Sequence, residues 1–441
     1  MRVRLRRLWE DIRSSYWFVP TLMSLAAFGL VFAAGWVDER VETDALPMTD
    51  WVKSASPAAV RGALATIAAS AISVAGVVFS ITMVALTMAS QQFGPRLIRN
   101  FMRQGWTQWS LGAFFGSFIY CLIALLRLPS ETELHVPTPI TVLMGVAIGV
   151  AAFAVLIYFI HQVAVFLQAP RVIQDVADDM IASIDACCPE PEARIEVTLP
   201  KDFEERARAI SSGSSGYVQG IAEWGMIELA RAHGVVVRLC IRPGSFVFPG
   251  LPLAWVGPAP NEFTEQFIHE FREQIVIGAE RTATQDPGYA IDQLVEIAVR
   301  ALSPGVNDPY TAINCVDQLS RGFAHLAYRD LPPVVRYDES ATVRLVHRPY
   351  SYSVLFDESF GQIRRNANGN YMVTMALLNA MKRIAAGNGS PELREVVDAE
   401  TRRLVESARD EYEGSDEWRS LQDAVQEIGR PPGAGDSARR H

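Results

Sequence analysis

Apolar residues fall into four long runs within the first 168 residues, and polar residues dominate the rest of the chain. Each run is about 20 residues or longer, the length that an α-helix needs to cross a membrane. These runs cover about residues 16–37, 59–89, 106–126 and 140–166. The pattern therefore predicts an α-helical membrane protein with four transmembrane helices (residues 1–168), a mixed α/β cytoplasmic region (169–428) and a disordered tail (429–441).

The first run could alternatively be a secretory signal peptide, because arginines precede it and small residues at 33–35 offer a cleavage site. The apolar stretch from Tyr16 to Val37 is, however, longer than a usual signal-peptide core. Trp17 and Trp36 also stand at its two ends, where interfacial anchors of a spanning helix lie. The sequence therefore favours a first transmembrane helix.

Basic residues predict the orientation of the helices. Five arginines precede the first helix, whereas the loops at 38–57 and 127–139 are acidic or nearly neutral. Three further arginines, Arg96, Arg99 and Arg103, follow the second helix on one face of a short segment. By the positive-inside rule, both termini are cytoplasmic in a bacterial inner membrane. The three arginines would then lie at the inner mouth of a pathway, favouring anions, or would hold phospholipid headgroups of the bilayer.

A stripe of polar side chains runs along the second helix, which has no charge from Gly62 to Ala89. Hydroxyls recur every seven positions, and two more polar residues share their face; the stripe is Thr66, Ser70, Ser73, Ser80, Thr87 and Gln91. Small hydroxylated residues are typical of close helix packing in membranes. Alternatively, hydroxyls from several subunits of a homo-oligomer line a water-filled path for small ions.

Small residues also recur on the third and fourth helices. Gly112 and Gly116 have GxxxG spacing, as do Gly145 and Gly149, with Ala152 close to one turn further on. Such faces favour close contact between helices, either within one subunit or between subunits.

The region after Ala169 alternates between helical and strand patterns. Helices are expected at 171–187 and 221–233, with Gly234 as a C-terminal cap, and a strand at 194–199. Residues 235–257 contain three apolar runs separated by Pro-Gly turns, which predict antiparallel strands. Further helices are expected at 261–281, 289–302, 308–327, 360–386 and 391–412, and a strand pair within 342–357.

The densest polar cluster of this region lies around the helix predicted at 289–302. Its candidates for an ion or ligand site are Asp292, Glu296, Asn307 and Asp308. Oxygen ligands of this kind suit a hard cation. However, Glu296 with Arg300 also forms an ordinary i, i+4 pair, and Asp308 before Pro309 is a typical helix N-cap. Structural roles therefore compete with the ligand hypothesis.

Several functional classes find no support in the sequence. Neither a catalytic triad, a phosphate-binding loop, a zinc motif nor a dinucleotide fingerprint is present, so we expect neither enzymatic activity nor a cofactor. The five cysteines lack metal-binding spacing. The formal net charge of −9 disfavours nucleic acid as a partner.

Three segments together resemble a known family. They are VFSITMVALTMASQQFGPRLIRNF, RPGSFVFPGLPLA and DQLVEIAVRALSPGVNDPYTA, in this order. The chain is similar to bacterial membrane proteins of domain-of-unknown-function family 2254, from the first helix to about residue 415. This resemblance implies four N-terminal membrane helices and a cytoplasmic C-terminal region, and it implies no established activity.

Two functional hypotheses follow. The first is an oligomeric ion-conducting channel or transport pathway lined by the second helix and gated by the cytoplasmic region. The second is a membrane-anchored sensor or scaffold whose cytoplasmic region binds a ligand or a partner protein. The scarcity of ionisable residues within the spans favours the second hypothesis over an active transporter.

Overall fold

The computed structural model describes residues 17–40, 52, 54–94, 105–128, 138–166, 168–189, 203–258, 263–283, 285–332, 334–367, 369–387 and 389–428. The chain divides into two compact units, Met1–Gln168 and Ala169–His441. Four predicted features lie outside the described residues: the basic N-terminal segment, Arg96, Arg99 and Arg103, the strand at 194–199, and the tail at 429–441.

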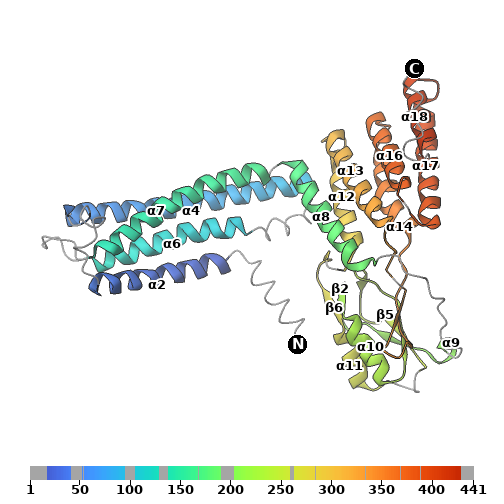
Figure 1. Ribbon diagram of the computed structural model, residues 1–441, viewed down its shortest axis with the longest axis horizontal. Helices are drawn as coiled ribbons and strands as arrows, with labels where there is room; N and C mark the ends of the chain where they lie inside the picture. The colour runs from blue at the N-terminus through green and yellow to red at the C-terminus, as the bar shows by residue number, and fades with distance from the viewer. Residues whose placement is uncertain are drawn as a thin grey trace. The chain divides into compact units, whose positions relative to one another are not determined.

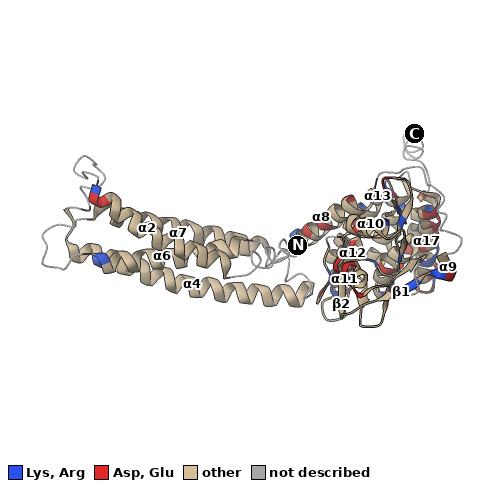
Figure 2. Ribbon diagram, turned by 90° about the horizontal axis from the view of Figure 1, so that it is seen from below, with Lys and Arg blue, Asp and Glu red and all other residues tan. Residues whose placement is uncertain are grey.

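Four apolar helices form the first unit (Figure 1): α2 (Phe18–Arg40), α4 (Pro57–Phe93), α6 (Trp106–Arg127) and α7 (Pro139–Phe166). By length and composition, each of the four is long and apolar enough to cross a membrane. Charged residues on these helices lie only near the helix ends (Figure 2). The predicted class, an α-helical membrane protein with four spanning helices, is confirmed.

Helix α4 is longer than its apolar run predicted. The Ser56 hydroxyl caps its start by accepting a hydrogen bond from the Ala59 amide, and the helix continues through Phe93. It ends at Gly94, whose φ of 100° suits glycine. At 1.5 Å per residue, its 37 residues measure about 55 Å, against about 30 Å of bilayer hydrocarbon. Part of α4 therefore extends beyond the hydrocarbon layer.

Helix α6 packs against each of the other three described helices of this unit. The two GxxxG faces, one on α6 and one on α7, lie against neighbouring helices of the same unit. A Cβ on Gly112 would lie 2.4 Å from Met23 Sδ of α2, and one on Gly145 would lie 2.7 Å from Leu64 Cδ2 of α4. Among the alternatives left open by the sequence, both faces are therefore used for contact within one chain.

The second unit contains an α/β half built on two sheets. The larger sheet has the order β1 (Arg208–Ser211), β5 (Pro252–Gly257), β3 (Val236–Leu239), β8 (Val343–Val346), β7 (Val335–Tyr337). The smaller sheet has the order β4 (Phe246–Val247), β2 (Gly216–Ile221), β6 (Ile275–Gly278). All neighbouring strands are antiparallel except β3 and β8. Three helices accompany them: α9 (Phe203–Arg206), α10 (Glu223–Ala232) and α11 (Glu265–Glu273).

The other half of this unit is helical. Its elements are α8 (Ala169–Cys187), α12 (Pro287–Ala301), α13 (Pro309–Leu326), α14 (Tyr352–Phe356), the π-helix η3 (Asp357–Gly361), α15 (Gln362–Asn366), α16 (Tyr371–Ala385), α17 (Pro391–Tyr412) and α18 (Asp416–Glu427). The predicted combination of helices and sheets in this region is confirmed.

Three local predictions were wrong. The helix expected at 261–281 ends at Glu273, and β6 follows it as a strand. The second strand expected within 342–357 is the helix α14, because Tyr352, Leu355 and Phe356 turn to one buried side. The single helix expected at 360–386 is divided, because α15 ends at Asn366 and α16 begins at Tyr371. The three strands expected at 235–257 do form and pair antiparallel, β3 with β5 in the larger sheet and β4 with β2 in the smaller one.

Candidate functional site

The hydroxyl stripe of α4 faces away from the described helices of its own unit. All six of its residues are exposed. The buried residues of α4 are Val60, Leu64, Ala68, Ala71, Ala75, Val78, Thr82, Ala85, Ala89 and Phe93. With 3.6 residues per turn, this buried set and the stripe lie on opposite sides of the helix. Packing among the described helices of one chain therefore leaves the stripe uncovered.

Three hydroxyls of the stripe donate hydrogen bonds to carbonyls of α4 itself. Thr66 Oγ1 donates to the Gly62 carbonyl at 2.7 Å, Ser73 Oγ to Ala69 at 2.8 Å, and Thr87 Oγ1 to Met83 at 2.8 Å. A hydroxyl that donates in this way keeps acceptor lone pairs that point outward. These three hydroxyl hydrogens are therefore satisfied within α4, and their oxygen atoms remain able to accept hydrogen bonds from outside the helix.

A line of small residues alternates with the hydroxyls, and the predicted stripe did not include it. Residues spaced alternately by four and three form one seam: Gly62, Thr66, Ala69, Ser73, Gly76, Ser80, Met83, Thr87 and Ser90. Only Met83 among them has a large side chain. A sustained repeat of 3.5 residues is the spacing of a left-handed helix–helix seam. The sequence does indicate this seam, because Gly62, Ala69 and Gly76 recur every seven residues.

Glycines of α4 differ from those of α6 and α7 in their surroundings. A Cβ built on Gly62 or Gly76 meets no atom within 4 Å, whereas one on Gly112 or Gly145 meets a neighbouring helix. Glycine within a helix destabilises it by about 1 kcal/mol relative to alanine. Contacts among the described residues therefore account for the glycines of α6 and α7 and leave those of α4 without a packing role.

The polar candidates of the C-terminal unit have separate partners. Glu296 Oε1 accepts from Arg300 Nη2 at 3.2 Å, as an i, i+4 pair. Asp308 caps α13 by accepting from the Thr311 amide at 3.1 Å and from its hydroxyl at 2.7 Å. Asn307, with a φ of 48°, precedes that cap. Within the described part of the chain, no group of three or more His, Cys, Asp and Glu side chains is placed to hold a metal ion.

Asp292 belongs to a different cluster, centred on Arg281. Arg281 donates to Asp292 Oδ2 through Nη1 and to Asp286 Oδ2 through Nε (3.0 Å) and Nη2 (2.7 Å). Asp286 is buried, and this burial raises its pKa against the opposing effect of Arg281. Partial burial also raises the pKa of Glu358 in η3, and the charge of Asp292 adds to that shift. The cluster joins segments that are distant in sequence.

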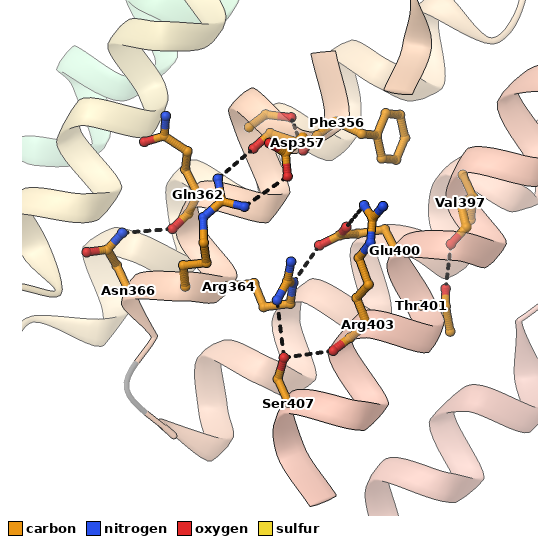
Figure 3. Close-up of polar contacts among 12 residues, drawn as sticks. Phe356, Asp357, Gln362, Arg364, Asn366, Val397, Glu400, Thr401, Arg403 and Ser407 are labelled. Carbon is orange, nitrogen blue, oxygen red and sulfur yellow. Dashed lines mark hydrogen bonds and ion pairs between the residues drawn. The ribbon is translucent and has the colours of Figure 1, made fainter. Parts of the chain in front are cut away.

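A second ion cluster joins α15 to α17 (Figure 3). Glu400 is 1% exposed and accepts from Arg364 Nε at 2.8 Å and from Arg403 Nη1 at 3.2 Å. Arg364 also donates to Ser407 Oγ at 3.2 Å. The carboxylate is thus paired on both oxygens, which is the arrangement that makes a buried charge tolerable. We assign this cluster a structural role.

The adjacent thiols of Cys187 and Cys188 lie at the end of α8. Burial raises the pKa of Cys187 to about 11 and that of Cys188 to about 12. Thiolate is the reactive form of cysteine, and a raised pKa disfavours it at neutral pH.

The four spanning helices and the α/β C-terminal unit define an integral membrane protein. The chain belongs to the DUF2254 family of predicted membrane proteins, whose model matches residues 13–383. It is similar to an uncharacterized protein of Mycobacterium bovis and to one of Mycobacterium tuberculosis, each 30% identical over 416 residues. The matched region covers 93% of this chain and 79% of each relative. No solved structure matches the chain.

Proposed function

We propose that the protein forms a homo-oligomeric ion-conducting pathway in the bacterial inner membrane, lined by α4, with both termini in the cytoplasm. The observation that carries this proposal is the uncovered hydroxyl stripe on an uncharged helix. In an oligomer, the α4 helices surround a common axis, and small residues of the seam let them approach closely. Outward-facing hydroxyl oxygens then replace part of an ion's hydration shell.

The seven-residue recurrence sets the spacing of such a pathway. Thr66, Ser73, Ser80 and Thr87 would form successive rings, separated by about 10 Å along the helix at 1.5 Å per residue. Apolar side chains such as Val77 and Val84 lie between the rings on the exposed face. This alternation supports passive permeation through a partly hydrophobic constriction, with the C-terminal unit as the gate.

Residues beyond the end of α4 would contribute to selectivity. Arg96, Arg99 and Arg103 follow α4 directly in the sequence and would stand at the inner mouth. There they favour anions or hold phospholipid headgroups.

The oligomer is tested by the mass of the protein in lipid nanodiscs. Gly76→Leu places a bulky side chain in the seam and is expected to shift the population toward monomers. Gly29→Leu is the matched control, since Gly29 of α2 likewise has open space around it but lies outside the seam. Equal masses for the wild-type protein and Gly76→Leu would show that α4 is not the interface.

Conduction is tested by single-channel recording of the purified protein in bilayers. Ser80→Leu and Thr87→Leu are expected to reduce or abolish conductance, because each replaces a ring of oxygen atoms by hydrocarbon. Phe79→Leu is the control, since Phe79 is exposed on another side of α4. Unchanged conductance in both stripe variants would remove α4 from the pathway.

One observation favours the second candidate, a membrane-anchored sensor or scaffold. Residues from Ala169 onward form a compact unit of their own, larger than the membrane unit. Such a unit has the size of an independent binding domain. A fragment that begins at Ala169 separates this candidate from the channel, because a sensor or scaffold domain binds its ligand without the membrane helices.

A further inference from the structure

The two halves of the C-terminal unit are connected mainly through loops. The α/β half is made of residues 203–258, 263–278 and 335–346, and the helical half of α8, α12, α13, α14, η3, α15, α16, α17 and α18. Among the described helices and strands, extensive packing occurs within each half and not between them. The two hydrophobic clusters of the α/β half contain no residue of the helical half. Figure 1 shows the strands and the helical layer as separate groups.

One connecting segment, which we name the strap (residues 279–283 and 285–286), is bonded to both halves. On the α/β side, the Ile221 amide donates to Gln285 Oε1 at 2.8 Å and Gln219 Nε2 donates to the Glu280 carbonyl at 2.8 Å. On the helical side, Ser183 Oγ of α8 donates to the Ala283 carbonyl at 2.9 Å. The strap is therefore held by polar contacts that water can replace when they open.

Arg281 connects two parts of the strap and also connects the strap to α12. Its guanidinium binds Asp286 at the end of the strap and Asp292 one turn into α12. Asp286 occupies the N-cap position of α12, yet its side chain makes no capping bond. The carboxylate is thus committed to Arg281, which fixes the angle at which the strap enters the helix.

The α/β half meets this cluster at the turn after β3. Gly244, with a φ of 87°, lies so close that a Cβ would stand 2.1 Å from Asp286 Oδ2 and 3.1 Å from Arg281 Nε. Arg242 of the same turn lies over the ring of Tyr350, with 4.9 Å between its Cζ and the ring centroid. Tyr350 belongs to the connection between β8 and α14, so two connections between the halves converge on this turn.

We infer that the strap is a hinge between the α/β half and the helical half, and that Arg281 is the latch that holds this hinge in one position. Polar interfaces without a shared apolar core open more readily than packed cores, and relative motion of the parts is their expected behaviour. Removing the guanidinium releases Asp286 and Asp292 together, which frees the strap while each half keeps its own core. The inference does not depend on ion conduction.

Hydrogen exchange of the full-length protein in lipid nanodiscs tests the hinge. Arg281→Gln is expected to raise the exchange rate of the strap amides and of the Ile221 amide about tenfold or more. Amides in β5 and α16 are expected to keep their wild-type rates. Arg300→Gln is the matched control, because Arg300 pairs with Glu296 on the same helix α12, and it is expected to leave the strap unchanged.

A second variant approaches the latch from the other half. Gly244→Ala drives a methyl group into the space of the Asp286 carboxylate and is expected to raise exchange in the same two places. Wild-type exchange of the strap in Arg281→Gln would overturn the inference. An equal rise in β5, α16 and the strap would also overturn it, because Arg281 would then support the whole fold instead of a hinge.

Discussion

Asp38 near the end of α2 binds Thr141 in the first turn of α7, across 103 positions of sequence. Its Oδ2 atom accepts from the Thr141 amide at 2.9 Å and from the Thr141 hydroxyl at 2.6 Å, while Oδ1 accepts from the Ile140 amide at 2.8 Å. The carboxylate thus caps a helix to which it does not belong. At the same end of the unit, Arg61 Nη2 of α4 donates to the Leu128 carbonyl at 2.8 Å.

Asp38→Ala should therefore destabilise the membrane unit. The change removes three acceptor contacts and leaves amides at the start of α7 without a partner, a loss of about 1–2 kcal/mol. Thermal unfolding in detergent micelles measures the effect. Glu39→Ala, an exposed neighbour, is the control and should unfold like the wild type. Equal midpoints for both variants would contradict the capping role.

Helix packing at Gly112 gives a second prediction. Gly112→Leu forces a side chain into the position of Met23 and should destabilise the unit by about 1–3 kcal/mol through overpacking. Gly29→Leu adds the same atoms to open space and should have little effect. Titration with a denaturing detergent gives the concentration at which each variant unfolds. If Gly112→Leu were as stable as the wild-type protein, α2 and α6 would be able to separate without loss of stability.

The paired carboxylate in Figure 3 gives a third prediction. Glu400→Ala leaves Arg364 largely buried without its charge partner, which should destabilise the C-terminal unit by about 3–5 kcal/mol. Glu413→Ala removes an exposed pair with Arg409 and should change stability by about 0–1 kcal/mol. Comparing the thermal midpoints of the two variants checks this difference. If both variants shifted the thermal midpoint by similarly small amounts, the buried pairing of Glu400 would not stabilise the unit.

Acid sensitivity is expected at Asp338. The hydrogen bond from Arg344 Nε, at 2.7 Å, lowers the pKa of Asp338 below its ordinary value, and amides of Ser340 and Thr342 add to the effect. A lowered pKa in the folded state stabilises the protein above the ordinary aspartate value of about 3.9, and this stabilisation is lost as the pH falls through the folded value.

Asp338→Asn should therefore lower the thermal midpoint at pH 7, and its difference from the wild type should shrink below about pH 4. The control is Glu339→Gln, whose carboxylate is exposed. Midpoints recorded from pH 8 to pH 3 make the comparison. A difference that stayed constant over this whole range would show that the charge of Asp338 has no part in the stability.

Sequence pattern alone predicted the membrane helices because a spanning helix leaves an uninterrupted record of about 20 apolar residues. It placed the end of α4 near Ala89, where the apolar run stops, whereas the helix continues to Phe93 and ends at a glycine. In the C-terminal unit, the local sequence pattern predicted the wrong element where tertiary packing determines the backbone conformation. Aromatic and β-branched residues at 352–356 are typical of strands, yet their side chains fill a helical core.

The candidate site was predictable only in part. The spacing of Thr66, Ser73 and Ser80 is visible in the sequence, but the side to which they turn depends on how α6 and α7 cover α4. Arg281 and Asp292 are eleven residues apart, and only the course of the strap brings them together. Arg364 and Glu400, 36 residues apart, meet because α14 packs against α17 and leads through η3 into α15. Pairings of this kind produce no periodic pattern in the sequence, so the sequence alone does not predict them.

A fragment that begins at Ala169 should fold without the membrane unit. Buried residues of α8, including Ile173, Val176 and Met180, belong to this unit, since α8 packs against α12 and α13. A fragment that begins at Phe203 lacks α8, exposes the apolar surface that α8 covers, and should aggregate or lose its cooperative thermal transition. Circular dichroism and size-exclusion chromatography measure both outcomes.

The same fragment separates the two functional candidates. If the fragment from Ala169 folds and the full-length protein conducts ions in bilayers with the predicted sensitivity to Ser80→Leu, the channel is supported and the C-terminal unit acts as its gate. If the fragment folds and binds a small molecule or a protein while the full-length chain conducts nothing, the sensor or scaffold is supported. Failure of the fragment to fold would remove the basis for an independent binding domain, because its stability would then depend on the membrane helices.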